Sequence, residues 1–329
     1  MIFAQKISSL GYSFADGRLS KPEQEKLRGM RKKTIITEFP TVLEYYSYIL
    51  NFMGILAGPC TFFNEWKEFI NKNKGETSTR RYLGLFAFSI FLVASNQACG
   101  IFGFKVQNLF DPVWVESTSF FYKLGYLKLF NAFGIRCQFY FAWMISESIN
   151  VAAGFGFNEE SKQWDLLSNV DVVACETSTN SPSDINNWNI RTSKWLRLVC
   201  YERAPRQFST VLTFSLSALW HGFFPGYYYL FAQGHCLTVV HRRFKKSGFL
   251  DWVQDQGVLA HKSFQLLSWF GYHAVFDYAS ACHFLLTQPR CFAWFKSVYF
   301  YGHVVVLVLM LVPLSKTSGK DEKVDKKLK

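Results

Sequence analysis

The sequence lacks the cysteine pattern of a metal site or of a disulfide framework. Its eight cysteines are scattered, most of them in apolar stretches, and no two form a CxxC pair. The seven histidines also show no spacing that builds a metal site. The first residues lack the charged start, apolar core and small-residue cleavage site of a signal peptide. We therefore expect neither a bound metal nor a secreted, disulfide-stapled domain.

Charge is also scarce, because Asp, Glu, Lys and Arg make up only 18% of the chain. Half of the residues are hydrophobic and 19% are aromatic. Membrane proteins concentrate Trp and Tyr at the bilayer interfaces. Mean hydropathy is nevertheless only +0.05, so polar segments must lie between the apolar ones. This composition predicts an all-α, polytopic membrane protein with a single membrane-embedded unit.

The charge that is present is mostly positive, with a formal net charge of +12. The basic clusters lie beside apolar runs, at residues 28–33, 80–81 and 242–246 and in the C-terminal tail. Lys and Arg in such places are typical of the cytoplasmic side of membrane helices. Nucleic-acid binding is less consistent with the sequence, because the aromatic residues lie inside uncharged runs. We expect membrane lipids and no nucleic acid as partners.

Several apolar stretches are candidates for membrane segments. Residues 82–104 form the clearest span, and residues 299–314 form a short last one. Residues 42–63 are interrupted by Asn51, Gly54 and the Gly58-Pro59 pair, which predicts a broken or re-entrant helix packed inside protein. Residues 158–187 are polar and predict an exposed loop that folds over a cavity. Residues 188–203 predict a basic amphipathic helix at the interface.

The segment around which the chain is organised is residues 208–232, which contain no Asp, Glu, Lys or Arg. A bilayer core requires ~20 apolar residues, so this segment is long enough to cross it. His221 lies in its middle, and an ionisable group at that depth marks a functional site. Pro225 would remove the usual hydrogen-bond donor to the His221 carbonyl and kink a continuous helix. The alternative is a buried histidine that holds a neighbouring helix by a hydrogen bond.

Two sequence motifs then stand together. Residues 186–195 read NNWNIRTSKW, and residues 217–228 read SALWHGFFPGYY. They closely resemble the paired signatures of the membrane-bound O-acyltransferase (MBOAT) family. The match is closest to the branch that reacylates lysophospholipids, in particular lysophosphatidylethanolamine and lysophosphatidylserine. NFMGILAGP at 51–59, WDLLSN at 164–169 and FKSVYFYGH at 295–303 also resemble that branch, so the resemblance covers nearly the whole chain.

The resemblance implies an MBOAT fold, with broken and re-entrant helices around a central tunnel. It implies transfer of an acyl group from acyl-CoA to the free hydroxyl of a lysophospholipid. His221 matches the catalytic histidine of the family and Asn189 its catalytic asparagine. Other matching positions are expected to contact substrate, namely Trp188, Arg191, Trp220, Gly222, Gly226 and Tyr227.

The chemistry of these residue types is consistent with that role. A neutral imidazole can take the proton of an alcohol at cytosolic pH, since its ordinary pKa is about 6.5. A carboxamide NH₂ can donate to the thioester oxygen without carrying charge. A thioester is already activated, so acyl-CoA is expected as co-substrate and no cofactor is required. The alternative for Asn189 is a helix cap or turn residue. Arg191, Lys194 and Arg197 either face CoA phosphates or lipid head groups, or belong to an ordinary interfacial helix.

We expect one membrane-embedded domain at residues 1–315 and a charged tail at 316–329. The last residues, KKLK, resemble a dilysine retrieval signal, which predicts the endoplasmic reticulum membrane and a cytosolic C-terminus. Family members usually have several more helices before the point where this sequence begins, so a shortened chain is expected. The alternatives are an inactive truncated isoform, a transport-type or non-catalytic membrane protein, and a relative that acylates a peptide or a sterol.

Overall fold

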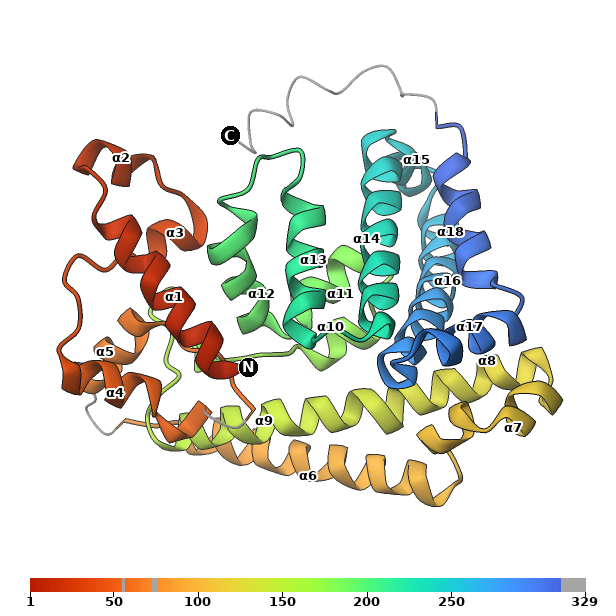
Figure 1. The fold of residues 1–329 in the computed structure, drawn as a ribbon, viewed down its shortest axis with the longest axis horizontal. Helices are drawn as coiled ribbons and strands as arrows, with labels where there is room; N and C mark the ends of the chain where they lie inside the picture. The colour runs from red at the N-terminus through yellow and green to blue at the C-terminus, as the bar shows by residue number, and fades with distance from the viewer. Residues whose placement is uncertain (55–56, 73–75, 315–329) are drawn as a thin grey trace.

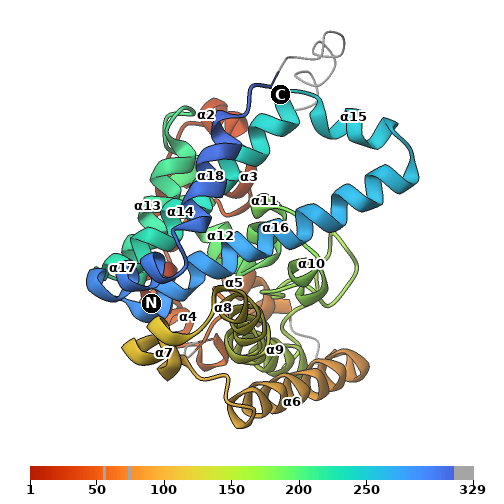
Figure 2. The ribbon, with the colours of Figure 1, turned by 90° about the vertical axis from the view of Figure 1, so that its right-hand side faces the viewer.

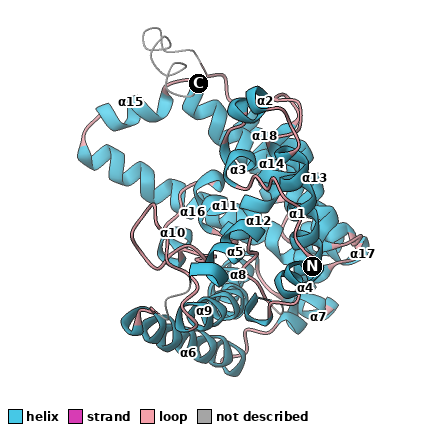
Figure 3. Ribbon diagram, turned by 90° about the vertical axis from the view of Figure 1, so that its left-hand side faces the viewer, coloured by secondary structure: helices cyan, strands magenta, loops and turns pink. Residues whose placement is uncertain are grey.

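The computed structural model describes residues 1–54, 57–72 and 76–314 (Figure 1). Within these residues the structure consists of helices and loops, without a β-strand (Figure 3). A single bridge between Asn158 and Gln163 is the only extended pairing in the described ranges. The all-α prediction is therefore confirmed for this part of the chain.

The N-terminal part forms a group of short helices at one end of the molecule (Figure 1). Its elements are α1 (Ile2–Gly17), α2 (Lys21–Lys26), α3 (Gly29–Lys33), α4 (Val42–Ile49), the 3₁₀ turn η1 (Phe52–Gly54) and α5 (Phe63–Lys72). Residues 42–63 are thus broken, as predicted, because α4 ends at Ile49 and α5 does not begin until Phe63. The predicted interruptions at Asn51, Gly54 and Gly58-Pro59 all lie between these two helices.

Two long helical runs lie side by side beneath the rest of the fold (Figure 1). One is α6 (Thr79–Ile101). The other joins α8 (Phe120–Leu129), the π-helix η3 (Phe130–Arg136) and α9 (Cys137–Ala152) without interruption. A bridge of 2.6 Å between Arg81 of α6 and the buried carboxylate of Glu147 of α9 joins the two runs. Between them the chain forms η2 (Val106–Phe110) and α7 (Pro112–Ser117).

The remaining helices stand across this base (Figures 1 and 2). They are α10 (Val172–Glu176), α11 (Ser181–Asn187), α12 (Ile190–Leu196) with the π-helix η4 (Arg197–Tyr201), α13 (Ser209–His221), α14 (Pro225–Lys246), α15 (Phe249–Asp255), α16 (Val258–Leu285), α17 (Gln288–Ser297) and α18 (Tyr301–Leu311). Figure 2 shows α16 as one long helix, which packs against α14 and α18. The largest hydrophobic core joins α8 and η3 to α16 and α17.

One described helix, α6, is long and apolar enough to cross a bilayer, in agreement with the span predicted at 82–104. Helices α17 and α18 satisfy the same criterion only when taken together, and they are bent by 76° relative to each other. Only 22% of the apolar window of α6 is buried within the chain. Its exposed side chains include Phe86, Ile90 and Phe91. The tail at 316–329 and its dilysine motif lie outside the described residues.

The prediction of a single kinked helix through residues 208–232 is wrong. Helix α13 ends at His221, and α14 begins at Pro225 and runs back beside α13 (Figure 1). Gly222 has φ +131°, a conformation that L side chains rarely adopt, so the helix stops there. Pro225 occupies the first turn of α14, where its missing N–H leaves no intrahelical bond unmade. His221 therefore lies at the turn of a helical hairpin and not on a kinked helix.

Another predicted helix also differs in its bounds. The amphipathic helix predicted at 188–203 starts later, because Asn189 and not an earlier residue is the N-cap of α12. Elsewhere, α16 runs without interruption from Val258 to Leu285 despite its internal His and Asp residues, of which His273 and Asp277 are buried.

The turn of the hairpin is fixed by a close backbone approach at Gly226. The Gly226 N–H donates to the Leu286 carbonyl at 2.8 Å, and a Cβ at this position would lie 2.1 Å from the Cys282 carbonyl oxygen. We expect Gly226→Ala to lower the free energy of unfolding by about 1–3 kcal/mol, because neither backbone can yield without moving a helix. Thermal unfolding of the detergent-solubilised protein measures this loss.

Gly271→Ala is the matched control on α16. A Cβ there meets nothing within 4 Å, so the substitution should stabilise its helix by up to about 1 kcal/mol. Equal unfolding temperatures for Gly226→Ala and the wild type would contradict the close approach of α14 to α16.

Candidate active site

The His221 side chain is surrounded by aromatic rings from three helices. Its ring centroid lies 4.9 Å from that of Trp220 on α13, 5.1 Å from Phe231 on α14 and 5.6 Å from His283 on α16. Tyr227 lies 5.6 Å from His221 and 5.0 Å from His283. No described residue hydrogen-bonds to either ring nitrogen of His221, and both nitrogens remain accessible to solvent. The imidazole thus keeps a free acceptor in an apolar shell.

Asn189 lies where α11 gives way to α12 and has a left-handed backbone, with φ 48° and ψ 50°. Such a conformation is uncommon for a residue with a side chain and is found at functional sites and turns. The Asn189 carbonyl accepts the first hydrogen bond of α12, from the Ser193 N–H at 3.0 Å. Its side chain makes no capping bond. Asn189 is therefore the N-cap of α12, which is the alternative interpretation given above for this residue. Its carboxamide makes no capping bond, so it is available for another hydrogen bond.

The orientation of that carboxamide follows from Asn169, which is 2% exposed. The Arg191 backbone N–H can only donate, and it donates to Asn169 Oδ1 at 2.9 Å. The Asn169 Nδ2 group must then donate, and it does so to Asn189 Oδ1 at 3.2 Å. The Nδ2 group of Asn189 consequently points away from Asn169. In the part of the chain that the structure describes, it has no hydrogen-bond partner and it stays accessible.

Aromatic contacts connect the two segments. Trp188, next to Asn189, packs against Phe139 with centroids 5.7 Å apart. Phe139 in turn contacts His283 at 6.4 Å, and His283 contacts His221. No hydrogen bond joins Asn189 directly to His221 among the described residues. The structure therefore brings both motifs to one aromatic cluster, formed by Trp188, Phe139, His283, His221 and Tyr227.

Comparison with known proteins identifies the family of this chain. A family model described as MBOAT, membrane-bound O-acyltransferase family, matches residues 20–258. The chain belongs to this family. It is 32% identical to the Membrane-bound glycerophospholipid O-acyltransferase 1 of Mus musculus over 340 residues, covering 94% of this chain and 66% of the relative. It is 33% identical to the Membrane-bound glycerophospholipid O-acyltransferase 2 of Gallus gallus, in a match that covers 96% of this chain and 64% of the relative.

A third relative is the Lysophospholipid acyltransferase 6 of Drosophila melanogaster, which is 32% identical over 335 residues. That match covers 95% of this chain and 46% of the relative. This member of the O-acyltransferase family thus spans a little less than two thirds of the length of the vertebrate relatives.

The other motif residues of this O-acyltransferase family member shape the site in different ways. Trp188 packs edge-on against Trp143 at 4.9 Å and lies under the Arg136 guanidinium at 5.2 Å. Trp220 contacts Trp195, and its indole N–H has no partner within the described ranges. A Cβ on Gly222 would meet the Tyr227 ring at 3.4 Å. Gly222 and Gly226 thus allow the turn of the hairpin to pack closely against the aromatic cluster.

Arg191 points inward and not toward an open site. Its side chain is fully buried. The guanidinium pairs with both carboxylate oxygens of Glu65 and donates to the Cys60 carbonyl at 2.7 Å and the Leu166 carbonyl at 3.0 Å. Arg191 thus ties α12 to α5 and to the 154–166 segment. Asn169 and His283 are the residues that sequence reasoning missed. Asn169 stood inside a quoted motif without a role, and His283 carries no local signal.

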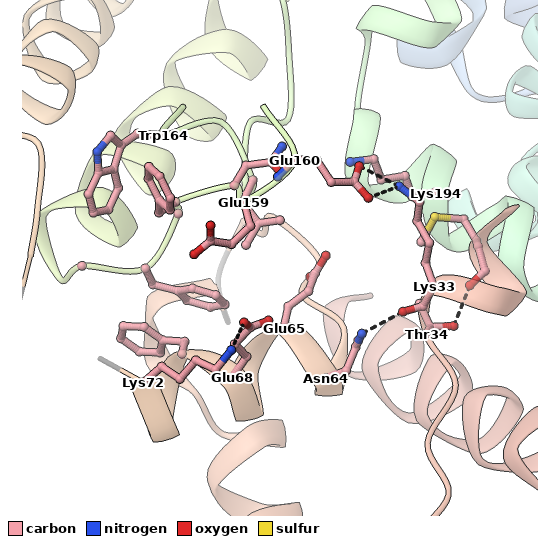
Figure 4. Close-up of a pocket in the computed structure, with 18 of the residues that line it drawn as sticks. Lys33, Thr34, Asn64, Glu65, Glu68, Lys72, Glu159, Glu160, Trp164 and Lys194 are labelled. Carbon is pink, nitrogen blue, oxygen red and sulfur yellow. Dashed lines mark hydrogen bonds and ion pairs between the residues drawn. The ribbon is translucent and has the colours of Figure 1, made fainter. Parts of the chain in front are cut away.

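A separate cavity of about 880 Å³ is lined by Glu65, the ion-pair partner of this arginine (Figure 4). Its walls come from α3, α5, residues 154–166 and the end of α12 with η4. The prediction that the polar segment beginning at 158 folds over a cavity is confirmed, since Glu159, Glu160 and Trp164 line it. Asp165 closes that loop by accepting from Asn158 and Ser161, each at 2.8 Å. We call this space the α5–α12 cavity. Neither His221 nor Asn189 lines it.

Removal of the Arg191 guanidinium tests its structural role. Arg191→Met would leave the Glu65 carboxylate and two carbonyls without their donor, so we expect a loss of about 3–5 kcal/mol in the free energy of unfolding. Arg242→Met is the matched control, because Arg242 is exposed and Thr210 is its one hydrogen-bond partner within the described ranges. It should change stability by less than ~1 kcal/mol. Thermal unfolding in detergent compares the two, and similar unfolding temperatures would refute the role.

Proposed function

We propose that the chain transfers a fatty acyl group from acyl-CoA to the free hydroxyl of a lysophospholipid. The observation that carries this proposal is the cluster that gathers an unpartnered imidazole and, beside it, a segment with an unpartnered carboxamide donor. The printed names of the relatives, glycerophospholipid O-acyltransferase and lysophospholipid acyltransferase, support the class of acceptor. Lysophosphatidylethanolamine, lysophosphatidylserine and lysophosphatidylcholine are the acceptors to be compared.

In the proposed reaction His221 is the general base. One ring nitrogen takes the proton of the lysophospholipid hydroxyl while its oxygen attacks the thioester carbon. The tetrahedral adduct then collapses, the carbon–sulfur bond breaks, and the imidazolium returns the proton to the CoA thiolate. The product is an ester and free CoA. An apolar shell favours this role because burial disfavours the charged imidazolium before the substrates arrive.

Asn189 supplies the oxyanion donor in this proposal. Its Nδ2 group is turned outward by Asn169, and the left-handed backbone places the side chain at the start of α12. A preorganised amide donor of this kind lowers the barrier by about 2.7–4 kcal/mol, because the oxygen gains charge only in the transition state. Asn169 is the positioning residue, since it decides which end of the Asn189 carboxamide faces the substrate.

We also propose the cellular setting. The exposed apolar side chains of α6 favour direct contact with lipid, and the break at Gly222 favours a packed interior rather than a simple bundle. A polytopic arrangement of residues 1–315 around a tunnel would let acyl-CoA approach from the cytosol and the lysolipid from the bilayer. The C-terminal lysines support the endoplasmic reticulum membrane with a cytosolic C-terminus. The reaction needs no metal or cofactor, because the thioester is already activated.

Substitution at the two motif residues tests the proposal. With oleoyl-CoA and a panel of lysophospholipids, we expect His221→Ala to lower kcat about 10²–10⁴-fold. Asn189→Ala should lower it about 10²–10³-fold. Release of free CoA thiol and formation of diacyl product are both measured. His235→Ala on α14 is the matched control and should keep its rate. Wild-type rates in both motif variants would show that the site is elsewhere.

Asn169 is tested through its coupling to Asn189. Asp at position 169 still accepts from the Arg191 N–H but cannot donate, so the Asn189 carboxamide should turn its NH₂ group inward. We expect Asn169→Asp to lower kcat about 10²-fold with little effect on KM for acyl-CoA. The Asn169→Asp/Asn189→Ala double variant should be no slower than Asn189→Ala alone, because the same donor is lost in both. If the fold losses of the two single variants multiply in the double variant, Asn169 does not act through Asn189.

A further inference from the structure

The α5–α12 cavity is assembled from segments that are far apart in the sequence. Its volume of about 880 Å³ is within the range of small-molecule pockets, which is ~300–1,000 Å³. Part of its lining is aromatic, because Phe69 stacks on Phe155 with centroids 4.5 Å apart and Phe157 packs against Trp164 at 5.5 Å. The space is therefore large enough for a small organic molecule and offers it both apolar and polar walls.

Most of the charged side chains in the lining are paired within the chain. Lys33 pairs with Glu160 at 2.9 Å, and Lys72 pairs with Glu68 at 2.8 Å. The other ion pairs that include a lining residue are Glu65 with Arg191, Glu202 with Arg197 at 3.6 Å and Glu159 with Lys162 at 2.7 Å. These pairs satisfy their own charges, so they do not need a ligand.

Lys194 of α12 is different from the other lysines of the lining. Its side chain forms no hydrogen bond and no ion pair with any residue of the described ranges. The residue is partly buried, and Figure 4 shows it on the same side of the cavity as Lys33. The cavity thus contains a primary amine that has no counter-ion beside it.

The surroundings of Lys194 favour its neutral form. Burial lowers the pKa of Lys194 most, and the positive charges of Arg191 and Lys33 lower it further. Glu65 and Asp165 act in the opposite direction, but Glu65 is bound to Arg191 and Asp165 closes its own loop. The other charged groups of the lining are Glu68, Lys72, Glu76, Glu159, Glu160, Arg197 and Glu202. A lysine that is partly desolvated and close to other cations is an activated nucleophile.

We propose that Lys194 is a self-acylation site, whose amine accepts a short acyl group from an acyl thioester that enters the α5–α12 cavity. The neutral Nζ attacks the carbonyl carbon of the thioester, so that a carbon–nitrogen bond forms and the carbon–sulfur bond breaks. The proton of the amine goes to the departing thiolate, and the products are an amide on Lys194 and a free thiol. The charged lining favours a short acyl group over a long alkyl chain. The modification removes the positive charge of Lys194.

The relative rate of acetylation tests the proposal on the wild-type chain. The full chain in lipid nanodiscs is treated with limiting acetyl-CoA, and the label on each lysine is quantified by peptide mass spectrometry. We expect Lys194 to be acetylated at least about threefold faster than the exposed Lys21 and Lys246. The urea-denatured chain is the control, because there the three lysines should react at similar rates. Equal or slower labelling of Lys194 in the folded chain overturns the proposal.

The pH profile of labelling separates an activated amine from an accessible one. The rate rises with pH as the ammonium group loses its proton, so a lowered pKa moves the rise to lower pH. We expect the labelling rate of Lys194 to rise at lower pH than that of Lys21 and Lys246. Profiles that coincide for the three lysines would also overturn the proposal.

A neighbouring charge provides a variant that leaves Lys194 itself intact. Lys33→Met frees Glu160, which lies within electrostatic reach of Lys194, so Lys194 gains the counter-ion that it lacks. We expect the acetylation of Lys194 to slow about threefold and its profile to move to higher pH. Lys67→Met is the matched control, because it frees Glu44 outside the cavity, and it should label as the wild type does. Wild-type labelling of Lys194 in Lys33→Met would contradict the proposed activation.

Acyl transfer to lipid is measured in parallel, because self-acylation does not depend on the proposed function. A chain that acetylates Lys194 but transfers no acyl group to a lysophospholipid would refute the proposed function and support the self-acylation site. A chain that acylates lysophospholipids but labels Lys194 no faster than Lys21 would overturn the self-acylation site and leave the proposed function intact.

Discussion

The interaction on which the functional half of this fold depends is the buried guanidinium of Arg191. It satisfies a carboxylate on α5 and two carbonyls, Cys60 and Leu166, that come from segments far from it in sequence. A charged group with no exposure is stable only when its donors are used in this way. Because α12 is fixed through this residue, the positions of Asn189 at its start and Lys194 near its end are fixed as well.

The hairpin at His221 determines which side chains surround the imidazole. A histidine in the middle of one long apolar helix would contact only the neighbours that pack against one face of that helix. The break at Gly222 instead turns α14 back, so that Tyr227 and Phe231 from α14 and His283 from α16 surround the same imidazole. Gly226 allows this because it has no side chain where α14 meets the end of α16. The geometry of the hairpin therefore requires glycine at positions 222 and 226, whichever acceptor the site binds.

Local sequence predicted the features that local chemistry determines. The span of α6 follows from a long run without charge, and the interruption between α4 and α5 follows from the Gly58-Pro59 pair. The partner of Arg191 could not be predicted in this way, because Glu65 is 126 residues distant. His283 likewise reaches His221 only through the packing of α16. Of the candidate site, the sequence motifs indicated the two central residues, and tertiary contacts supplied the residues that orient and surround them.

Helix α12 contributes to two chemically different environments of the molecule. Asn189 at its start lies by the His221 cluster, which is aromatic and offers only uncharged groups, an imidazole and a carboxamide. Lys194 near its end lines the α5–α12 cavity, whose wall carries charges of both signs. Because one short helix, with a rise of about 1.5 Å per residue, places both Asn189 and Lys194, the way in which Arg191 anchors that helix determines the positions of both residues together.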